Sequence, residues 1–95
     1  MLAVMRYAVR TEQAHRLQEV YPRHRAYLDR FAEGGELLLI GTFEDPLANG
    51  SMAIFRTKDA AERFVRDDPF VLEGVAEPHV LAWDALEFVD LTGTT

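Results

Sequence analysis

The sequence predicts an α+β domain of ferredoxin-like type, with the element order βαββαβ and two helices on one face of an antiparallel sheet. Three observations lead to this fold class. Apolar runs typical of strands alternate with segments of helical periodicity, glycine- and proline-containing turns separate them, and 95 residues provide for a single hydrophobic core. We therefore expect one domain over residues 1–90 and a frayed tail over residues 91–95.

The chain begins with a predicted strand followed by a helix. Residues 2–9 are apolar at nearly every position except Arg6, as in a strand that is buried on both faces. Thr11 is expected to cap the helix. Pro22 interrupts the apolar stripe of that helix because its ring removes a backbone N–H, so we expect a kink there or a new helix beginning at Pro22. Gly34-Gly35 then ends the helix.

Two strands joined by a long hairpin are predicted next. Residues 36–42 are apolar on both sides, and residues 51–56 form a shorter strand. The pairs Asp45-Pro46 and Asn49-Gly50 between them are turn signals. We therefore expect these two strands to be antiparallel neighbours.

The last third of the chain predicts a second helix and a final strand. Thr57 is expected to cap a helix over residues 58–67, which Asp68-Pro69 ends. Residues 79–89 supply the fourth strand, and a fifth strand after Asp84 is left open. The buried face of the helix is expected to comprise Ala61, Phe64 and Val65.

The apolar character of the first two strands extends to both of their faces. Two helices can cover only one face of the sheet, so the second face needs another cover. A second copy of the chain is the simplest one. We therefore expect a two-fold homodimer in which the open sheet faces pack against each other.

The composition limits the classes of function. Ten basic against 16 acidic residues give a net charge of −6, which repels nucleic acid and anionic membranes, and no basic patch offsets it. The chain has no cysteine, no signal-peptide pattern at its start and no apolar run long enough to span a membrane. We expect a soluble, cytoplasmic protein that binds neither nucleic acid nor membrane.

One histidine lies on the apolar face of the first predicted helix. His24 continues the stripe to which Tyr21 and Leu28 belong, so its imidazole should point inward or into a crevice. An isolated histidine in such a position is more often a buried structural residue, held by one hydrogen bond, than a functional one. The sequence has no pair of ligands with the spacing of a helical metal site, and we expect neither metal nor cofactor.

An aspartate breaks the burial pattern at the end of the second helix. Asp68 follows Phe64 by four positions, on the core-facing side, where the helix macrodipole disfavours a negative charge. The residue before a proline leaves helical geometry, so Asp68 can turn its carboxylate across the structure. Considered without His24, Asp68 would simply be the residue that ends the helix in an Asp-Pro turn. Because buried charges tend to be paired, and the two helices pack side by side, we expect contact between His24 and Asp68.

These residues belong to a set of short motifs spread along the chain. The motifs are Tyr21-Pro22-Arg23-His24, Leu28, Gly35-Glu36-Leu37-Leu38, Gly41, Asp67-Asp68-Pro69-Phe70 and Gly74-Val75. Through them the chain resembles the YciI-like (YCII-related) family over nearly its whole length. The resemblance implies a ferredoxin-like fold of the dimeric α+β barrel type, with a His–Asp pair in a cleft that maps onto His24 and Asp68. The fold also resembles that of muconolactone isomerase, and one class of members is associated with dehydrochlorination of a chlorinated hydroxyquinol.

The same resemblance draws attention to residues that would bind a substrate. The family often has an arginine three residues before the histidine, where this chain has Tyr21. Anion binding would then fall to Arg23 or Arg6. Tyr21 could donate a hydrogen bond to a developing oxyanion, although a half-buried helix tyrosine is the commoner situation. Phe70, close to Asp68 in sequence, could form a wall of the cleft.

Three functions are compatible with these residues. The first is a cofactor-free lyase or isomerase that acts on a small phenolic, quinol or lactone molecule by general acid/base catalysis through His24 and Asp68. The second is a non-catalytic small-molecule-binding or accessory domain, and the third is a cofactor-independent monooxygenase of the dimeric α+β barrel type. We favour the first because the His–Asp pair has little structural use. The sequence specifies neither the substrate nor the pathway.

Overall fold

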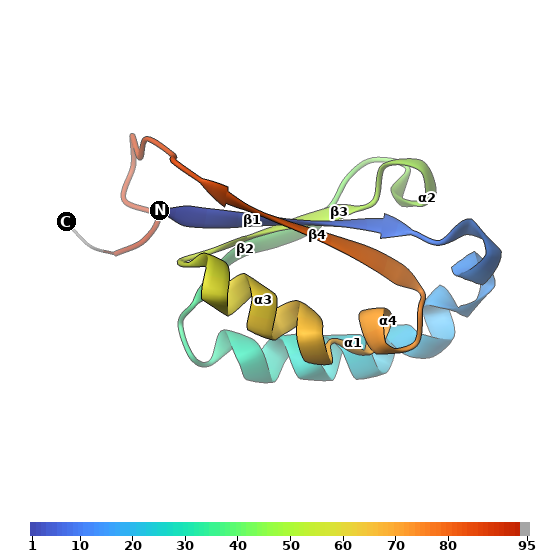
Figure 1. The fold of residues 1–95 in the computed structure, drawn as a ribbon. Coiled ribbons are helices and arrows are strands. Elements are labelled where there is room, and N and C mark those ends of the chain that lie inside the picture. Colours follow the sequence, from blue (N-terminus) through green and yellow to red (C-terminus); the bar gives the residue numbers. More distant parts are fainter. Residues whose placement is uncertain (94–95) are drawn as a thin grey trace.

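A computed structural model describes residues 1–93 of the chain. One sheet and the helices packed on it make up the molecule (Figure 1). No helix in the described range is long and apolar enough to cross a membrane. The elements in chain order are β1 (Leu2–Val9), the 3₁₀ helix η1 (Thr11–Arg16), α1 (Leu17–Ala32), β2 (Leu37–Thr42), α2 (Pro46–Asn49), β3 (Ser51–Phe55), α3 (Lys58–Asp67), α4 (Pro69–Leu72) and β4 (Ala76–Trp83).

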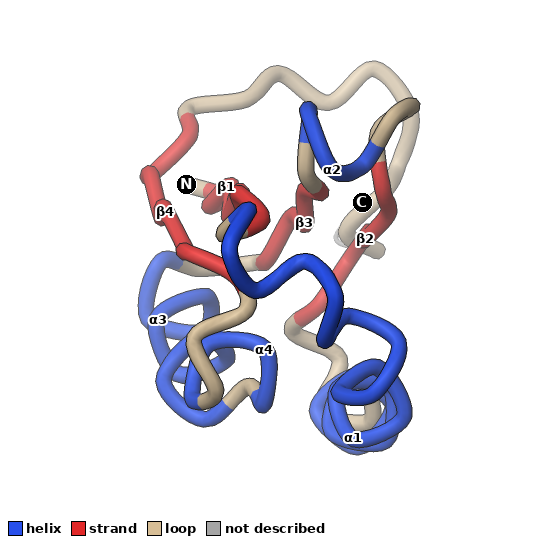
Figure 2. The backbone as a smooth tube through the Cα atoms, turned by 90° about the vertical axis from the view of Figure 1, so that its right-hand side faces the viewer, coloured by secondary structure: helices blue, strands red, loops and turns tan. Residues whose placement is uncertain are grey.

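The strands follow the order β2-β3-β1-β4, and each pair of neighbours is antiparallel. β1 and β2 are connected through α1 and separated by β3, which is the split βαβ arrangement. The helices α1, α3 and α4 lie on the same face of the sheet, and α2 belongs to the connection between β2 and β3 (Figures 1 and 2). The predicted α+β fold of ferredoxin-like type is confirmed.

The hydrophobic core lies between the sheet and the helices on it. β1 turns Ala3, Met5 and Tyr7 toward the helices, and each of them is at most 4% exposed. Phe55 of β3 and Phe64 of α3 are fully buried, with ring centroids 5.4 Å apart. Truncating such a ring to alanine costs about 3–5 kcal/mol, so these two side chains are a large part of the stability.

Helix α3 follows its sequence closely. The Thr57 hydroxyl accepts a hydrogen bond from the Ala60 N–H at 3.0 Å, as the predicted N-cap requires. Ala61 and Phe64 are fully buried, and Val65 is partly buried against the same core. The predicted bounds, cap and buried face of this helix are confirmed.

The first helical segment departs from the prediction. Thr11–Arg16 is a 3₁₀ helix without a side-chain cap at its start, so the cap expected at Thr11 is wrong. α1 continues through Pro22, so no new helix begins at that residue. A proline removes one backbone hydrogen bond, and buried Val20 and His24 on either side of it hold the helix against the rest of the fold.

The last strand begins and ends earlier than the sequence predicts. β4 starts at Ala76, opposite Val9, and ends at Trp83, opposite Leu2. β1 begins at Leu2, the partner of Trp83, and the ladder between β1 and β4 ends at this pair. Residues 84–93 contain no strand, and the fifth strand left open above is absent from that range. The domain boundary at residue 90 stays a prediction, and residues 94–95 of the expected tail lie outside the described residues.

The sheet face opposite the helices is also apolar. Leu39, Ile54, Val4 and Leu81 form one row across all four strands on this face. Leu39 and Leu81 are 50% and 53% exposed, and Trp83 near the end of the row is 43% exposed. The sequence therefore predicts both apolar faces correctly, and the open one presents large apolar side chains to solvent.

Candidate functional site

Asp68 stands at the junction of α3 and α4, where its backbone is extended. The proline that follows disfavours helical geometry at Asp68, so the chain turns there and the carboxylate points into the fold. The side chain is fully buried. Oδ1 lies 2.8 Å from a His24 nitrogen and accepts the Phe70 N–H at 3.2 Å, and Oδ2 accepts the Tyr7 hydroxyl at 2.5 Å. A buried carboxylate requires such partners, because it has lost its water.

His24 reaches Asp68 from α1. Its Nδ1 lies 2.8 Å from Asp68 Oδ1, and its side chain is 8% exposed. An ionised carboxylate only accepts hydrogen bonds, so the proton lies on Nδ1 and the neutral imidazole carries its lone pair on Nε2. The Phe70 ring stacks on the imidazole, with centroids 4.1 Å apart and ring planes 14° from parallel. Carboxylate and phenyl ring together fix the orientation of the imidazole.

Tyr7 completes this cluster, and sequence reasoning missed it. Burial, together with the negative charge of Asp68, raises the pKa of Tyr7 far above its ordinary value, so the hydroxyl stays protonated and donates to the carboxylate. The sequence contains a signal for this role. Tyr7 follows Ala3 and Met5 at the two-residue period of the core-facing side of β1, where a buried hydroxyl needs a partner.

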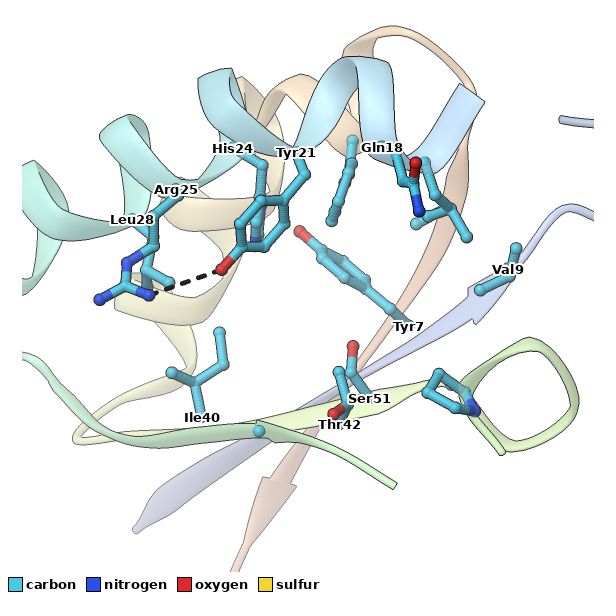
Figure 3. Close-up of a pocket in the computed structure, with 16 residues that line it drawn as sticks. Tyr7, Val9, Gln18, Tyr21, His24, Arg25, Leu28, Ile40, Thr42 and Ser51 are labelled. Carbon is cyan, nitrogen blue, oxygen red and sulfur yellow. Dashed lines mark hydrogen bonds between the residues drawn. The ribbon is translucent and has the colours of Figure 1, made fainter. Parts of the chain in front are cut away.

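A cavity of about 450 Å³ lies between α1 and the sheet, with His24 in its wall (Figure 3). Among the described residues, no buried side-chain nitrogen or oxygen lacks a hydrogen-bond partner. Since no described residue bonds the Nε2 of His24, that nitrogen reaches the cavity. The wall is mostly apolar, as in small-molecule sites. Its polar side chains are Tyr7, Gln18, Tyr21, His24, Arg25, Thr42 and Ser51.

The comparisons with known proteins identify the family and the fold. The YCII-related domain matches residues 1–84. The chain belongs to the YCII-related family. Its fold is similar to that of 5-chloro-2-hydroxyhydroquinone dehydrochlorinase (TftG) from Burkholderia phenoliruptrix AC1100, solved in complex with 2,5-dihydroxybenzoquinone. The TM-score is 0.70 at 23% identity, over 88% of this chain and 94% of that one, and this likeness shows the shared fold. No match is found among the curated proteins.

In this YCII-related domain, Tyr21 lines the cavity one turn before His24 and is 46% exposed. Its hydroxyl accepts a long hydrogen bond from Arg25, at 3.5 Å (Figure 3). Arg25 also donates to Asp29 at 3.0 Å. Sequence reasoning missed Arg25 because position 25 lies beside the apolar stripe. A side chain four residues after Tyr21 is nevertheless its neighbour on the helix surface, so the spacing contained the signal.

Two arginines that were candidates for substrate binding are not brought to the cavity. Arg23 bonds to Glu73 through two of its nitrogens, and Arg16 bonds to the same carboxylate at 2.7 Å. Arg6 lies on the opposite sheet face from Tyr7, because successive strand residues alternate between faces. Among the described residues that line the cavity, Arg25 is the one cationic side chain. Neither Arg23 nor Arg6 lines this cavity.

The arrangement offers a proton acceptor at the edge of a small, mostly apolar cavity. Nε2 of His24 can take up a proton, and the buried carboxylate of Asp68 stabilises the imidazolium that results. Within residues 1–93, no three His, Asp or Glu side chains lie close enough together to hold a metal ion. An imidazole oriented in this way can accept and return a proton, which is the chemistry that a general acid/base site requires.

Proposed function

We propose that this YCII-related domain is a cofactor-free lyase or isomerase that acts on a small phenolic, quinol or lactone ring. His24 is the general base and acid, and Asp68 is its positioning residue. The observation that carries the proposal is the buried 2.8 Å contact between His24 Nδ1 and Asp68 Oδ1, next to a cavity that His24 lines. The reaction named for the structural neighbour, a dehydrochlorination of a hydroxyquinol, belongs to the same class.

The proposed step is a proton transfer to His24. Nε2 accepts a proton from a ring C–H or O–H, and the electron pair of the broken bond moves into the ring. In a lyase reaction the imidazolium first returns its proton to the ring carbon that carries chlorine, which gives a keto tautomer; His24 then removes a second ring proton, that electron pair expels chloride, and HCl is lost overall. In an isomerisation the imidazolium returns its proton to another ring atom, and no group leaves. Asp68 favours both reactions, because it stabilises the positive charge on the imidazole.

The neighbouring side chains have supporting roles in this proposal. Phe70 stacks on the imidazole and forms a wall of the cavity, which suits a flat ring. Tyr21 lines the same cavity with a hydroxyl that can donate to a developing oxyanion. Arg25, which contacts that hydroxyl, adds a positive charge near the oxyanion.

We also propose that the domain works as a homodimer in the cytoplasm. Support for the dimer comes from the open sheet face, where Leu39, Leu81 and Trp83 are about half exposed in the single chain. The absence of cysteine suits a reducing compartment. Sedimentation equilibrium at micromolar concentration tests the assembly, and a stable monomer would overturn it.

A turnover assay with a panel of ring compounds tests the catalytic proposal. Chlorinated hydroxyquinols, catechols and enol lactones are incubated with the protein, and ring absorbance and released chloride are followed. We expect turnover of at least one compound, its loss in His24→Gln, and its retention in the matched variant His15→Gln, which changes an exposed histidine outside the cavity. His24→Gln should keep the wild-type circular dichroism spectrum.

Other outcomes of the panel separate the alternative functions. Thermal stabilisation by a ring compound without turnover of any of them would assign a non-catalytic binding domain. Consumption of dissolved oxygen with a quinol would assign a cofactor-independent monooxygenase. Equal turnover in wild type and His24→Gln would remove the proposed base.

A further inference from the structure

The carboxylate of Asp68 is shared between two side chains that come from opposite layers of the fold. Its Oδ2 accepts the hydroxyl of Tyr7, on β1, at 2.5 Å. Its Oδ1 lies 2.8 Å from Nδ1 of His24, on α1. Two donors on one carboxylate compete for its negative charge, because each of them draws part of that charge toward itself. The strength of one hydrogen bond therefore depends on the presence of the other.

Asp68 has few other groups that balance its charge. The side chain is fully buried, and within the described chain His24 is the one basic side chain in contact with it. The bond from the Phe70 N–H, at 3.2 Å, is the longest of its three hydrogen bonds. A hydroxyl on a carboxylate forms a charge-assisted bond, which is roughly twice as strong as a bond between neutral groups. The Tyr7 hydroxyl is therefore the main competitor of His24 for this carboxylate.

The sheet fixes the position of the Tyr7 hydroxyl. Tyr7 lies on a central strand, with Ser51 of β3 and Pro78 of β4 as its register partners. Gly50 has a φ of +75°, and a Cβ at this position would lie 1.9 Å from the Tyr7 carbonyl oxygen, so only glycine permits so close an approach of β3. The Tyr7 ring projects from the sheet toward α1 (Figure 3). Its hydroxyl thus meets Asp68 in one geometry and opposes rotation of the carboxylate, whose terminal torsion has no sharp preference of its own.

We infer that Tyr7 is a positioning residue that limits how strongly Asp68 stabilises the imidazolium of His24. The inference rests on the proposed function, in which His24 takes up a proton and then returns it. A carboxylate without the Tyr7 hydrogen bond would hold the imidazolium more strongly, which favours uptake of the proton and opposes its return. The hydroxyl weakens this hold, so that one imidazole can carry out both steps.

Proton NMR of the protein without ligand tests this role. The Nδ1 proton of His24, identified through its coupling to nitrogen-15, moves downfield as its hydrogen bond to the carboxylate strengthens. We expect a downfield shift in Tyr7→Phe, which removes the competing donor. Tyr27→Phe is the matched control, because the Tyr27 hydroxyl donates to the Phe64 carbonyl at 2.8 Å and bonds to neither Asp68 nor His24. This control should leave the Nδ1 signal in place.

A second variant tests the opposite direction and keeps the buried hydroxyl. 3-Fluorotyrosine at position 7 adds one small atom, and its fluorine makes the hydroxyl a stronger donor. The Nδ1 proton of His24 should then move upfield. This variant decides the question if Tyr7→Phe does not fold.

Three results would overturn the inference. They are an Nδ1 proton that does not move downfield in Tyr7→Phe, an equal shift in Tyr27→Phe, and no upfield shift with 3-fluorotyrosine. Failure of the proposed function has a different signature. A panel of ring compounds without turnover would leave both shifts intact, because the NMR measurement uses the protein alone.

Discussion

Helix α4 has a carboxylate at each end, and cationic or imidazole side chains from the first helical segments bind both. At its N-terminus Asp68 contacts His24, and both side chains are buried. At its C-terminus Glu73 binds Arg16 and Arg23, and all three side chains are at least 28% exposed. Each end of α4 thus has a carboxylate bound by side chains from the first helical segments, but the Asp68 contact is buried and the Glu73 cluster is exposed to solvent.

The difference shows what burial adds to an ionic contact. Water screens the exposed cluster and competes for its hydrogen bonds, so such pairs contribute little to stability and have no special chemistry. The buried pair has no water to replace a lost partner, and its carboxylate depends on protein donors. The same burial keeps His24 in one orientation with one nitrogen toward the cavity. Burial therefore makes the Asp68 carboxylate dependent on its protein donors, and it lets the same carboxylate hold the His24 imidazole in one orientation.

Removal of the buried carboxylate should have the largest effect. Asp68→Ala leaves the His24 Nδ1, the Tyr7 hydroxyl and the Phe70 N–H without their acceptor. We expect a loss of about 3–5 kcal/mol in the free energy of unfolding, measured by urea denaturation. The matched variant Asp67→Ala changes an exposed aspartate next to it and should cost much less. Equal losses in the two variants would contradict the account of burial.

Tyr7→Phe should have an intermediate effect. It removes one donor to Asp68, and we expect a loss of about 1.5–3 kcal/mol near neutral pH. The pKa of Tyr7 is raised in the folded state, so its contribution to stability is present below the unfolded pKa of about 10 and falls at higher pH. Burial and the charges of Asp67 and Asp68 raise the pKa of Tyr27 to about 12. Tyr27 therefore changes the stability with pH in the same direction as Tyr7.

Urea denaturation between pH 8 and about pH 12 tests the alkaline part of this prediction. The wild type should lose stability as the pH rises above about 10, and Tyr7→Phe should lose less over the same range while keeping the Tyr27 contribution. Tyr21→Phe, which removes an exposed hydroxyl, serves as the control and should follow the wild type. Parallel curves for Tyr7→Phe and wild type would show that the Tyr7 hydroxyl is not buried.

Glu73→Gln should have the smallest effect. Hydrogen bonds and charge from Arg23, and then from Arg16, lower the pKa of Glu73. Its contribution is therefore present above the ordinary carboxyl pKa and is lost as the pH falls through the lowered one. We expect Glu73→Gln to lose less stability than Tyr7→Phe. The loss in Glu73→Gln should disappear in about 1 M salt, because charge screening is then nearly complete. Thermal denaturation at two salt concentrations measures it, and a salt-independent loss would mean that the cluster is shielded from solvent.

Much of this molecule could be predicted from its sequence, because periodicity and turn chemistry agree with the final fold. Thr57 and Asp68-Pro69 mark the two ends of α3 through local backbone rules. The contact between His24 and Asp68 could be predicted because each occupies a core-facing position where an unpaired polar group is costly. In each case a local rule and the global arrangement gave the same answer.

The errors arose where pairing or packing decided the outcome. The end of β4 coincides with the beginning of its antiparallel partner β1 at Leu2, and no local signal near Trp83 records it. α1 continues through Pro22 because Val20 and His24, two residues to either side of it, are buried and hold the helix in place. Arg23 lies next to His24 in sequence, but it turns toward Glu73, whereas Arg25 reaches the cavity. Neighbouring helix positions point in different directions, so adjacency to a site residue is weak evidence for a role in the site.

The central claim is that Asp68 holds the His24 imidazole with Nε2 toward the cavity, and the tautomer of His24 tests it most directly. Nitrogen-15 NMR of the imidazole in the neutral form distinguishes a protonated Nδ1 from a protonated Nε2. The account predicts a single Nδ1–H tautomer, hydrogen-bonded to Asp68, whose Nε2 signal shifts when 2,5-dihydroxybenzoquinone is added. An Nε2–H tautomer, or an averaged pair of signals like that of a histidine free in water, would contradict it.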